Sequence, residues 1–321
     1  MLLLALFAGW VACAFAPLSL AAAGRSNVEG TITTRDTSRA TLAFISDTQA
    51  PIIFETLALK ERNNTEATAF LFSAINSMRP ATLFILGDVV SLGFHESSWN
   101  AIDSYLATLR KNSIPVYGIM GNHDVMFFSK TGEERFLARF PDYVRTGYVR
   151  TVDSVAVVLM NSNFNALSAN EKKFQQAWYR SALDSLEREP AVRTVIVSCH
   201  HSPYSNSTVV GPNPEAQQQF VEGFMATPKC RLFVSGHAHA FEHFRFNGKD
   251  FFVVGGGGGL QQPLKQGKEM DFADITASMK KPMFHFLTVR RDTDSLVVVS
   301  HGASEDLTAV LDWDRVAVPL H

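Results

Sequence analysis

One recurring pattern constrains the fold of this chain more than any other feature. A short apolar run stops abruptly at a cluster of polar residues, and segments with helical periodicity lie between these runs. The apolar runs cover residues 42–46, 83–86, 116–120, 195–199 and 232–235. The helix-like segments cover residues 64–78, 97–111, 169–189 and 214–226, with a shorter one at 133–140. Alternating strands and helices predict βαβ units and a largely parallel sheet.

Antiparallel strands are expected as well. The runs 241–246 and 250–254 flank Asn247-Gly248-Lys249, which is a hairpin signal. A second hairpin is predicted from the runs 282–290 and 295–301, and two further strand-like runs lie at 147–152 and 155–160. The economical arrangement is two packed sheets with helices outside. Residues 260–281 are polar and lack a period, which predicts a surface loop.

The composition supports a folded protein with a sizeable core. Of the 321 residues, 46% are hydrophobic and 19% are charged. With a net charge of −2, the chain lacks the excess of positive charge that sequence-independent nucleic-acid binding requires. The oligomeric state is left open by the sequence.

The N-terminal segment is predicted to be a signal peptide. Residues 1–23 carry no charged side chain, and the apolar run 2–16 ends at Pro17. That run would span about 22 Å as a helix, less than the ~30 Å hydrocarbon core of a membrane. The small residues 21–23 suit cleavage before Gly24, so we expect a secreted or periplasmic protein with no membrane span after cleavage. An uncleaved anchor is the alternative.

The remaining chain is expected to hold a polar N-terminal tail at 24–40, one domain at 41–302 and a C-terminal extension at 303–321 that packs on the domain. Cys199 closes one strand-like run and Cys230 opens the next. In parallel neighbouring strands their thiols would lie at opposite ends, about 16 Å apart, whereas a disulfide needs Cα atoms within ~7 Å. We therefore predict two free, buried thiols.

Residue types that bind metals gather at the ends of the five apolar runs. They are Asp47, Gln49, Asp88, Asn122, His200, His237 and His239. In open α/β sheets, ligands bind at the carboxyl ends of the strands. Carboxylate, imidazole and amide ligands suit borderline divalent ions, and the set is too large for one tetrahedral ion. Each cluster alone would be an ordinary turn, but the whole set predicts two ions that share a carboxylate.

The chain resembles the calcineurin-like metallophosphoesterases over about residues 41–301. The motifs of that family are D-x-H, G-D, G-N-H-[DE], a strand-terminal H and G-H-x-H. The corresponding residues here are Asp47-Thr48-Gln49, Gly87-Asp88, Gly121-Asn122-His123-Asp124, His200 and Gly236-His237-Ala238-His239. The resemblance implies an α/β fold, specifically an α/β/β/α sandwich of two packed mixed sheets with helices outside.

The resemblance also implies a dinuclear centre of divalent ions, which could be Mn, Fe, Zn or Mg. Asp47 and His239 would hold the first ion, and Asn122, His200 and His237 the second. Asp88 would bridge the two ions. A hydroxide that bridges them would attack phosphorus.

Substrate contacts are implied for Asn122, His123 and His201. His123 would be the general acid for the leaving group, and a histidine titrates in the right range for this role. Asp124 beside it would orient the imidazole ring.

Two residues depart from the family pattern. Gln49 stands where the first motif has His, so it either binds the first ion through its amide oxygen or only forms a hydrogen bond there. Ser91 stands where purple acid phosphatases have a Tyr ligand to ferric iron, so no purple chromophore is expected. The order of residues around His200 and His201 resembles the H-H-P-P-Y of the family, which favours His200 as the ligand.

The predicted function is metal-dependent hydrolysis of a small-molecule phosphoester. One alternative is a phosphodiesterase that acts on nucleotides or lipid head groups, and another is a catalytically weak phosphoester-binding protein. Substrate choice is expected in the loops 50–64, 125–132, 203–213 and 260–281. The five consecutive glycines at 255–259 lack the Lys-Ser/Thr of a phosphate loop, so we expect them either to let the backbone approach the site or to let it turn sharply after residues 251–254.

Overall fold

The computed structural model describes residues 40–52, 59–60 and 62–320. The predicted signal peptide, and the predicted tail up to residue 39, lie outside the described residues. Within the described residues, no helix has the length and apolar character needed to cross a bilayer.

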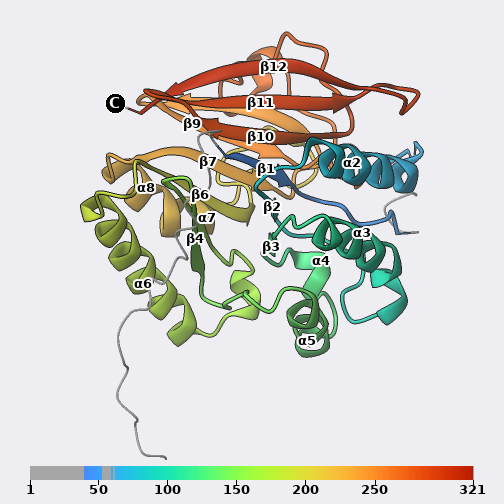
Figure 1. Cartoon of the computed structure of the whole chain (residues 1–321), viewed down its shortest axis with the longest axis horizontal. Coiled ribbons are helices and arrows are strands. Elements are labelled where there is room, and N and C mark those ends of the chain that lie inside the picture. Colours follow the sequence, from blue (N-terminus) through green and yellow to red (C-terminus); the bar gives the residue numbers. More distant parts are fainter. Residues whose placement is uncertain (1–39, 53–58, 61, 321) are drawn as a thin grey trace, which may run out of the picture.

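In the part of the chain that the structure describes, twelve strands form two six-stranded sheets (Figure 1). The first sheet has the order β12 (Val310–Pro319), β11 (Ser295–Ala303), β10 (His285–Arg291), β1 (Thr41–Ile45), β2 (Thr82–Ile85), β3 (Val116–Gly118). The second has the order β4 (Tyr148–Val152), β5 (Val155–Leu159), β6 (Thr194–His201), β7 (Cys230–Gly236), β9 (Lys249–Val254), β8 (Phe241–Phe246). Strands β1, β2 and β3 are parallel to one another, as are β5, β6, β7 and β9. Both sheets are mixed, because β10, β11 and β12 join the first sheet by antiparallel pairing, as β4 and β8 join the second.

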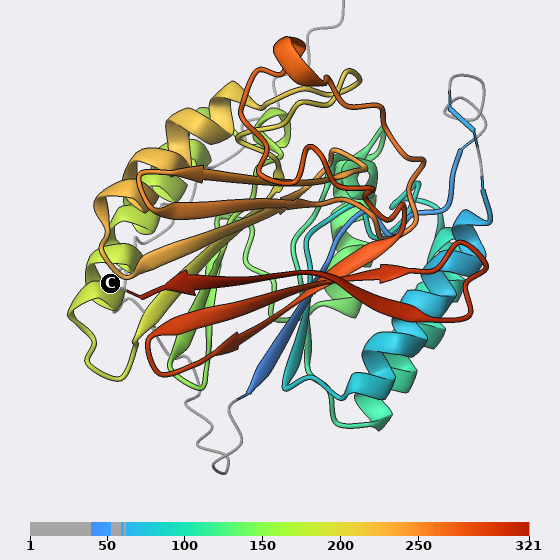
Figure 2. The same ribbon diagram turned by 90° about the horizontal axis from the view of Figure 1, so that it is seen from above.

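Helices cover the two outer sides of the sheets. The principal helices are α2 (Asn64–Met78), α3 (Asn100–Lys111), α5 (Ser129–Arg139) and α6 (Ala169–Arg188), with the short helices α4 (Asn122–Val125), α7 (Pro214–Ala216) and α8 (Glu222–Ala226). In Figure 2, α2 and α3 lie on one side of the strands and α6 to α8 on the opposite side. The predicted fold class, two packed mixed sheets with helices outside, is confirmed.

Along the strands of the second sheet, successive side chains belong alternately to two separate hydrophobic cores. Val157 and Leu159 of β5 join a buried cluster that also contains the apolar residues of β1 and β2. Val158 of β5 and Val197 of β6 join a separate cluster with side chains of α6 and α8. Successive side chains of a strand point to opposite faces. The central strands can therefore be apolar throughout because each face has its own covering layer.

Several predicted boundaries shift. The predicted helix 97–111 begins as a 3₁₀ turn at Glu96–Trp99 before α3, and the helix predicted at 133–140 begins at Ser129. A π-helical turn, Gln217–Val221, separates α7 from α8. The segment 303–321 contains β12, which pairs with β11 as an edge strand. In the predicted loop 260–281 the structure has one 3₁₀ turn, Gly267–Glu269.

The two cysteines behave as predicted. In the parallel pair of β6 and β7, Val195 lies opposite Cys230 and Cys199 lies opposite Ser235. Both thiols are free and buried. Burial raises the pKa of the Cys230 thiol to about 12, so it stays protonated and unreactive at neutral pH.

Candidate metal centre and active site

The predicted ligands converge from both sheets. Asp47, Asp88 and Asn122 follow β1, β2 and β3, while the histidines lie at the ends of β6 and β7. The φ angles of Asp47, Asp88 and His237 are 59°, 47° and 68°, in the left-handed region that such residues seldom occupy. Backbone strain of this kind gathers at functional sites.

A first cluster consists of Asp47, Asp88 and His239. Their ligand atoms all lie within 4.8 Å of one another, and all three residues are buried. Nε2 of His239 is 3.4 Å from Oδ1 of Asp47. The backbone N–H of His237 donates to the Asp47 carboxylate (2.9 Å to Oδ2), which ties the second sheet to the first.

A second cluster consists of His200, His201 and His237, again within 4.8 Å. Nε2 of His200 is 3.3 Å from Oδ2 of Asp88 and 3.3 Å from the amide oxygen of Asn122. The other carboxylate oxygen of Asp88 accepts from the backbone N–H of His123 at 2.8 Å. Asp88 therefore belongs to the first cluster and touches the second, as a bridging carboxylate must.

The donor set fits divalent ions. Nδ1 of His200 lies 2.9 Å from the Leu86 carbonyl oxygen, and Nδ1 of His239 lies 2.8 Å from that of Leu260. Each carbonyl oxygen accepts a hydrogen bond from the Nδ1–H group, so each ring turns Nε2 toward the carboxylates. Metal-binding histidines in proteins are held in this way.

The ionisable groups of the two clusters shift one another's pKa values. Burial lowers the pKa of His200, but the charge of Asp88 and its hydrogen bond raise it to about 9. Burial also opposes ionisation of Asp47, yet its hydrogen bond with His239 and the charge of His200 hold its pKa below the usual value. The opposite happens at His201, where burial and the charge of His200 lower the pKa to about 3.

His201 lies within the candidate metal centre, as a member of the second cluster. Its ring centroid is 4.4 Å from that of His237, and its Nδ1 is 2.9 Å from Oγ of Ser162. The sequence analysis missed Ser162. A signal was available, because the strand-like run 155–160 also ends in a polar cluster, Asn161-Ser162-Asn163.

Gln49 faces the first cluster. Its amide fits its surroundings when the nitrogen donates to the carbonyl oxygens of Asp47 and Asp88, at 3.2 and 2.9 Å. The amide oxygen then lies 3.2 Å from Nε2 of His239. This orientation turns the oxygen toward the same space as the His239 nitrogen.

The structure gives the Asp124 carboxylate and Nδ1 of His123 separate backbone hydrogen-bond partners. Nδ1 of the His123 ring lies 3.0 Å from the carbonyl oxygen of Ser91. The Asp124 carboxylate accepts instead from backbone N–H groups of Gly121, Val89 and Val90, at 2.8, 3.0 and 3.2 Å. Burial and the charge of Asp88 raise the pKa of Asp124 to about 8. Asp124 therefore joins the loops after β2 and β3, and Ser91 orients His123.

The glycine run lies against the centre as expected. A Cβ on Gly259 would be 2.5 Å from Cε1 of His239, and one on Gly257 would be 2.3 Å from the Ser46 carbonyl oxygen. Larger residues there would displace a candidate ligand or the end of β1.

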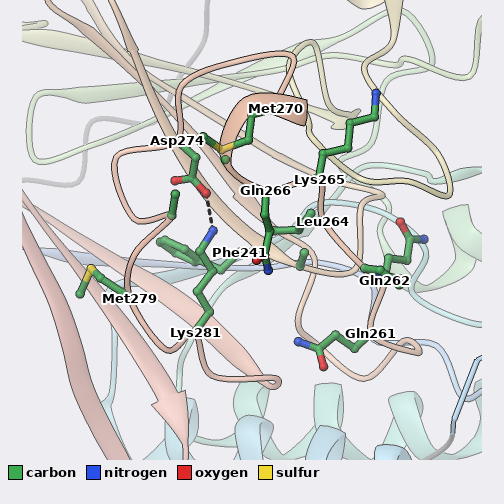
Figure 3. A pocket seen from close by; sticks show the side chains of 14 residues that line it. Phe241, Gln261, Gln262, Leu264, Lys265, Gln266, Met270, Asp274, Met279 and Lys281 are labelled. Atoms are coloured by element: carbon green, nitrogen blue, oxygen red, sulfur yellow. Dashed lines mark hydrogen bonds and ion pairs between the residues drawn. The ribbon is translucent and has the colours of Figure 1, made fainter.

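Two cavities lie near the clusters. One, of about 340 Å³, has Asn122 and His201 in its wall. The other, of about 440 Å³, begins at Ala240, next to His239, and is enclosed by the loop 260–281 (Figure 3). The charges of its two lysines are balanced, since Lys281 pairs with the buried Asp274 and Lys265 pairs with Asp271.

Comparisons of the sequence with known proteins found similarities. Residues 40–241 match the family model described as calcineurin-like phosphoesterase. A curated relative, purple acid phosphatase 22 of Arabidopsis thaliana, is 23% identical over 192 residues, which is 56% of this chain and 43% of the relative. The chain thus spans less than half the length of that relative.

Three solved structures share the fold at low sequence identity. A purple acid phosphatase, PPD1, from Lupinus luteus has a TM-score of 0.64 at 14% identity, over 88% of this chain and 54% of that chain. GAP50, the anchor in the inner membrane complex of Plasmodium, has a TM-score of 0.63 at 12% identity, over 88% and 89%. A dimetal phosphatase from Danio rerio has a TM-score of 0.54 at 13% identity, over 88% and 99%.

Proposed function

Since the chain belongs to the calcineurin-like phosphoesterase family, we propose that it hydrolyses small-molecule phosphoesters with the help of two divalent metal ions. The observation that carries this proposal is the position of Asp88, which belongs to one ligand cluster and lies 3.3 Å from a histidine of the other. A carboxylate in that position can join two ions.

The proposed ligands divide between two ions. Asp47, His239 and the amide oxygen of Gln49 would hold the first, Asn122, His200 and His237 would hold the second, and Asp88 would contribute to both. Paired ions of this kind activate a water molecule and neutralise charge on phosphate oxygens. The chain itself positions the ligands, because backbone carbonyls fix the rings of His200 and His239.

His123 is the proposed general acid. A carbonyl oxygen can only accept a hydrogen bond, so Nδ1 of His123 carries the proton that is donated to Ser91. Nε2 is then the atom that can hold a second proton and pass it to a leaving alkoxide. His123 is 8% exposed, so the ring is largely shielded from bulk water while it does this.

A catalytically weak phosphoester-binding protein is the second candidate. Gln49 favours it, because an amide oxygen is a weaker ligand than the imidazole usual at this place. The similarity in fold to the Plasmodium protein described as an anchor also fits it. Hydrolysis of diesters, such as nucleotides or lipid head groups, is a third reading of the same site. The proposed location is secreted or periplasmic, on the basis of residues 1–23 alone.

The experiment is an assay of metal-stripped protein with p-nitrophenyl phosphate and with bis-p-nitrophenyl phosphate, each after addition of Mn, Fe, Zn, Mg or Ca. We expect hydrolysis that requires added metal, and the ratio of the two rates separates monoesterase from diesterase. Asp88→Asn should lower the rate by about 10³ or more. Asp184→Asn makes the same change on the exposed side of α6 and should have no effect. Activity that survives both chelation and Asp88→Asn would contradict the proposal.

A further inference from the structure

The cavity of about 340 Å³ offers a place for the alcohol part of a substrate. It shares Asn122 and His201 with the candidate centre. An ester whose phosphate rested on the centre would therefore extend its alcohol part into this space. The other residues that concern its chemistry are Ser129, Asn163, Asn165, Asn213 and Glu215.

The charges of this cavity are balanced. Among the described residues that line it there is no Lys or Arg, and Glu215 is the one carboxylate. Nζ of Lys172, outside the lining, is 2.9 Å from Oε1 of Glu215 and offsets that charge. A second anionic group on a substrate would meet no unpaired cation among these residues, and it would lose hydration without compensation.

The amide side chains complement hydroxyl groups. Asn163 uses its amide nitrogen to donate to the Met120 carbonyl at 2.7 Å, so its oxygen remains to accept. Asn213 uses its oxygen to accept from the backbone N–H of Ala216 at 2.8 Å, so its nitrogen remains to donate. A hydroxyl group both donates and accepts, whereas a carboxylate or phosphate dianion only accepts.

We infer that the enzyme prefers phosphoesters of neutral, hydroxyl-rich alcohols, such as sugars and polyols, over esters whose alcohol part carries a second anionic group. This inference rests on the proposed function. The chemistry of the cavity wall, a balanced ion pair with both hydrogen-bond donors and acceptors, is what selects the substrate class.

A matched pair of substrates tests the inference. Glucose 6-phosphate and 6-phosphogluconate carry the same C6 phosphate, but 6-phosphogluconate is an open chain with a carboxylate at C1 in place of the hemiacetal ring, and the charge variants below isolate the effect of that carboxylate. We expect kcat/KM to favour glucose 6-phosphate by about tenfold or more, because an unpaired anion is disfavoured in a site without cations.

Two variants change the charge of the cavity wall. Asn165→Lys adds a cation to the wall, and Glu215→Gln leaves Lys172 unpaired. Both variants should raise kcat/KM for 6-phosphogluconate and shrink the ratio. The control Asn100→Lys adds the same charge at an exposed residue of α3 and should leave the ratio of kcat/KM for the two esters unchanged.

The outcomes separate this inference from the proposed function. Hydrolysis of p-nitrophenyl phosphate with equal kcat/KM for the two sugar esters overturns the inference and keeps the function. An unchanged ratio in folded Asn165→Lys and Glu215→Gln overturns it as well. If no ester is hydrolysed, the proposed function fails. Calorimetry on the metal-loaded protein then still decides the inference, because glucose 6-phosphate must bind more tightly than 6-phosphogluconate.

Discussion

Nδ1 of His123 lies 3.0 Å from the backbone carbonyl oxygen of Ser91, and this arrangement makes the role of His123 testable. We expect His123→Ala to lower kcat by roughly 10²–10⁴, the usual share of general acid catalysis. The loss should be smaller for nitrophenyl esters, whose leaving group needs little protonation. Bound metal, measured by elemental analysis, should be unchanged. If one ion were lost, His123 would be a ligand; equal losses on good and poor leaving groups would make it a phosphate-positioning residue.

Gln49, which faces the first cluster, stands where the first motif of the family has His. An amide oxygen favours harder ions, so the first site should bind more weakly than the second and should favour Mn or Mg. Gln49→His should tighten the first site and shift its preference toward Zn or Fe. Calorimetric titration of both proteins with Mn and Zn measures this. Identical affinities and preferences in the two proteins would mean that Gln49 does not touch the ion.

The candidate ligands could be picked out in the sequence because each one follows an apolar strand. The residues that orient them were harder to foresee. The carbonyl groups of Leu86, Leu260 and Ser91 hold the three rings, and a backbone carbonyl leaves no trace in the residue type. The amides that engage Asp124 are invisible for the same reason.

At the scale of elements, β8 contains a carboxyl group with an unusual pKa. Burial raises the pKa of Glu242 from 4.5 to about 7, although Ser205 Oγ and the Asn206 N–H donate to it. The folded state therefore keeps a proton that the unfolded state releases near pH 4.5. The resulting stability is fully present below pH 4.5 and is lost as the pH rises toward 7.

We accordingly expect the free energy of unfolding of the wild type to fall between pH 5 and 8, relative to that of Glu242→Gln, by up to roughly 3 kcal/mol. Gln can still accept from Asn206 and can donate to Ser205. Urea unfolding at both pH values measures the difference. Glu222→Gln, on an exposed part of α8, should follow the wild type. Parallel pH profiles of Glu242→Gln and the wild type would show that Glu242 is ionised in the fold.

Elements with a clear pattern of apolar residues were predicted accurately, and an element with an interrupted pattern was not. Helix α2 has the predicted bounds, because its apolar residues repeat at helical spacing and Pro80 follows closely. Strand β12 was not predicted as a strand. Its apolar residues are interrupted by Asp312, Asp314 and Arg315, and as an edge strand it needs only a few buried side chains.

For the molecule as a whole, β12 matters because it pairs with β11, which would otherwise be the edge strand of the first sheet. Val318 and Leu320 are buried in the cluster that both sheets share. Ending the chain after Ala303 should expose β11, lower Tm and increase aggregation. The milder Val318→Ala should lower the free energy of unfolding by about 1–3 kcal/mol, while Leu311→Ala, at a residue 56% exposed, should change it little. Equal effects of the two substitutions, by urea unfolding, would contradict this role.

The distribution of ligands over two sheets couples ion binding to the last stage of folding. Asp47 and Asp88 belong to one sheet and His200 and His237 to the other, so neither sheet alone presents a complete site. The ions would therefore bind the native state far better than any state in which the sheets have separated, and mass action would favour the assembled molecule. A protein leaving its place of synthesis without metal would be the more easily unfolded form, and metal supply would set how long it survives.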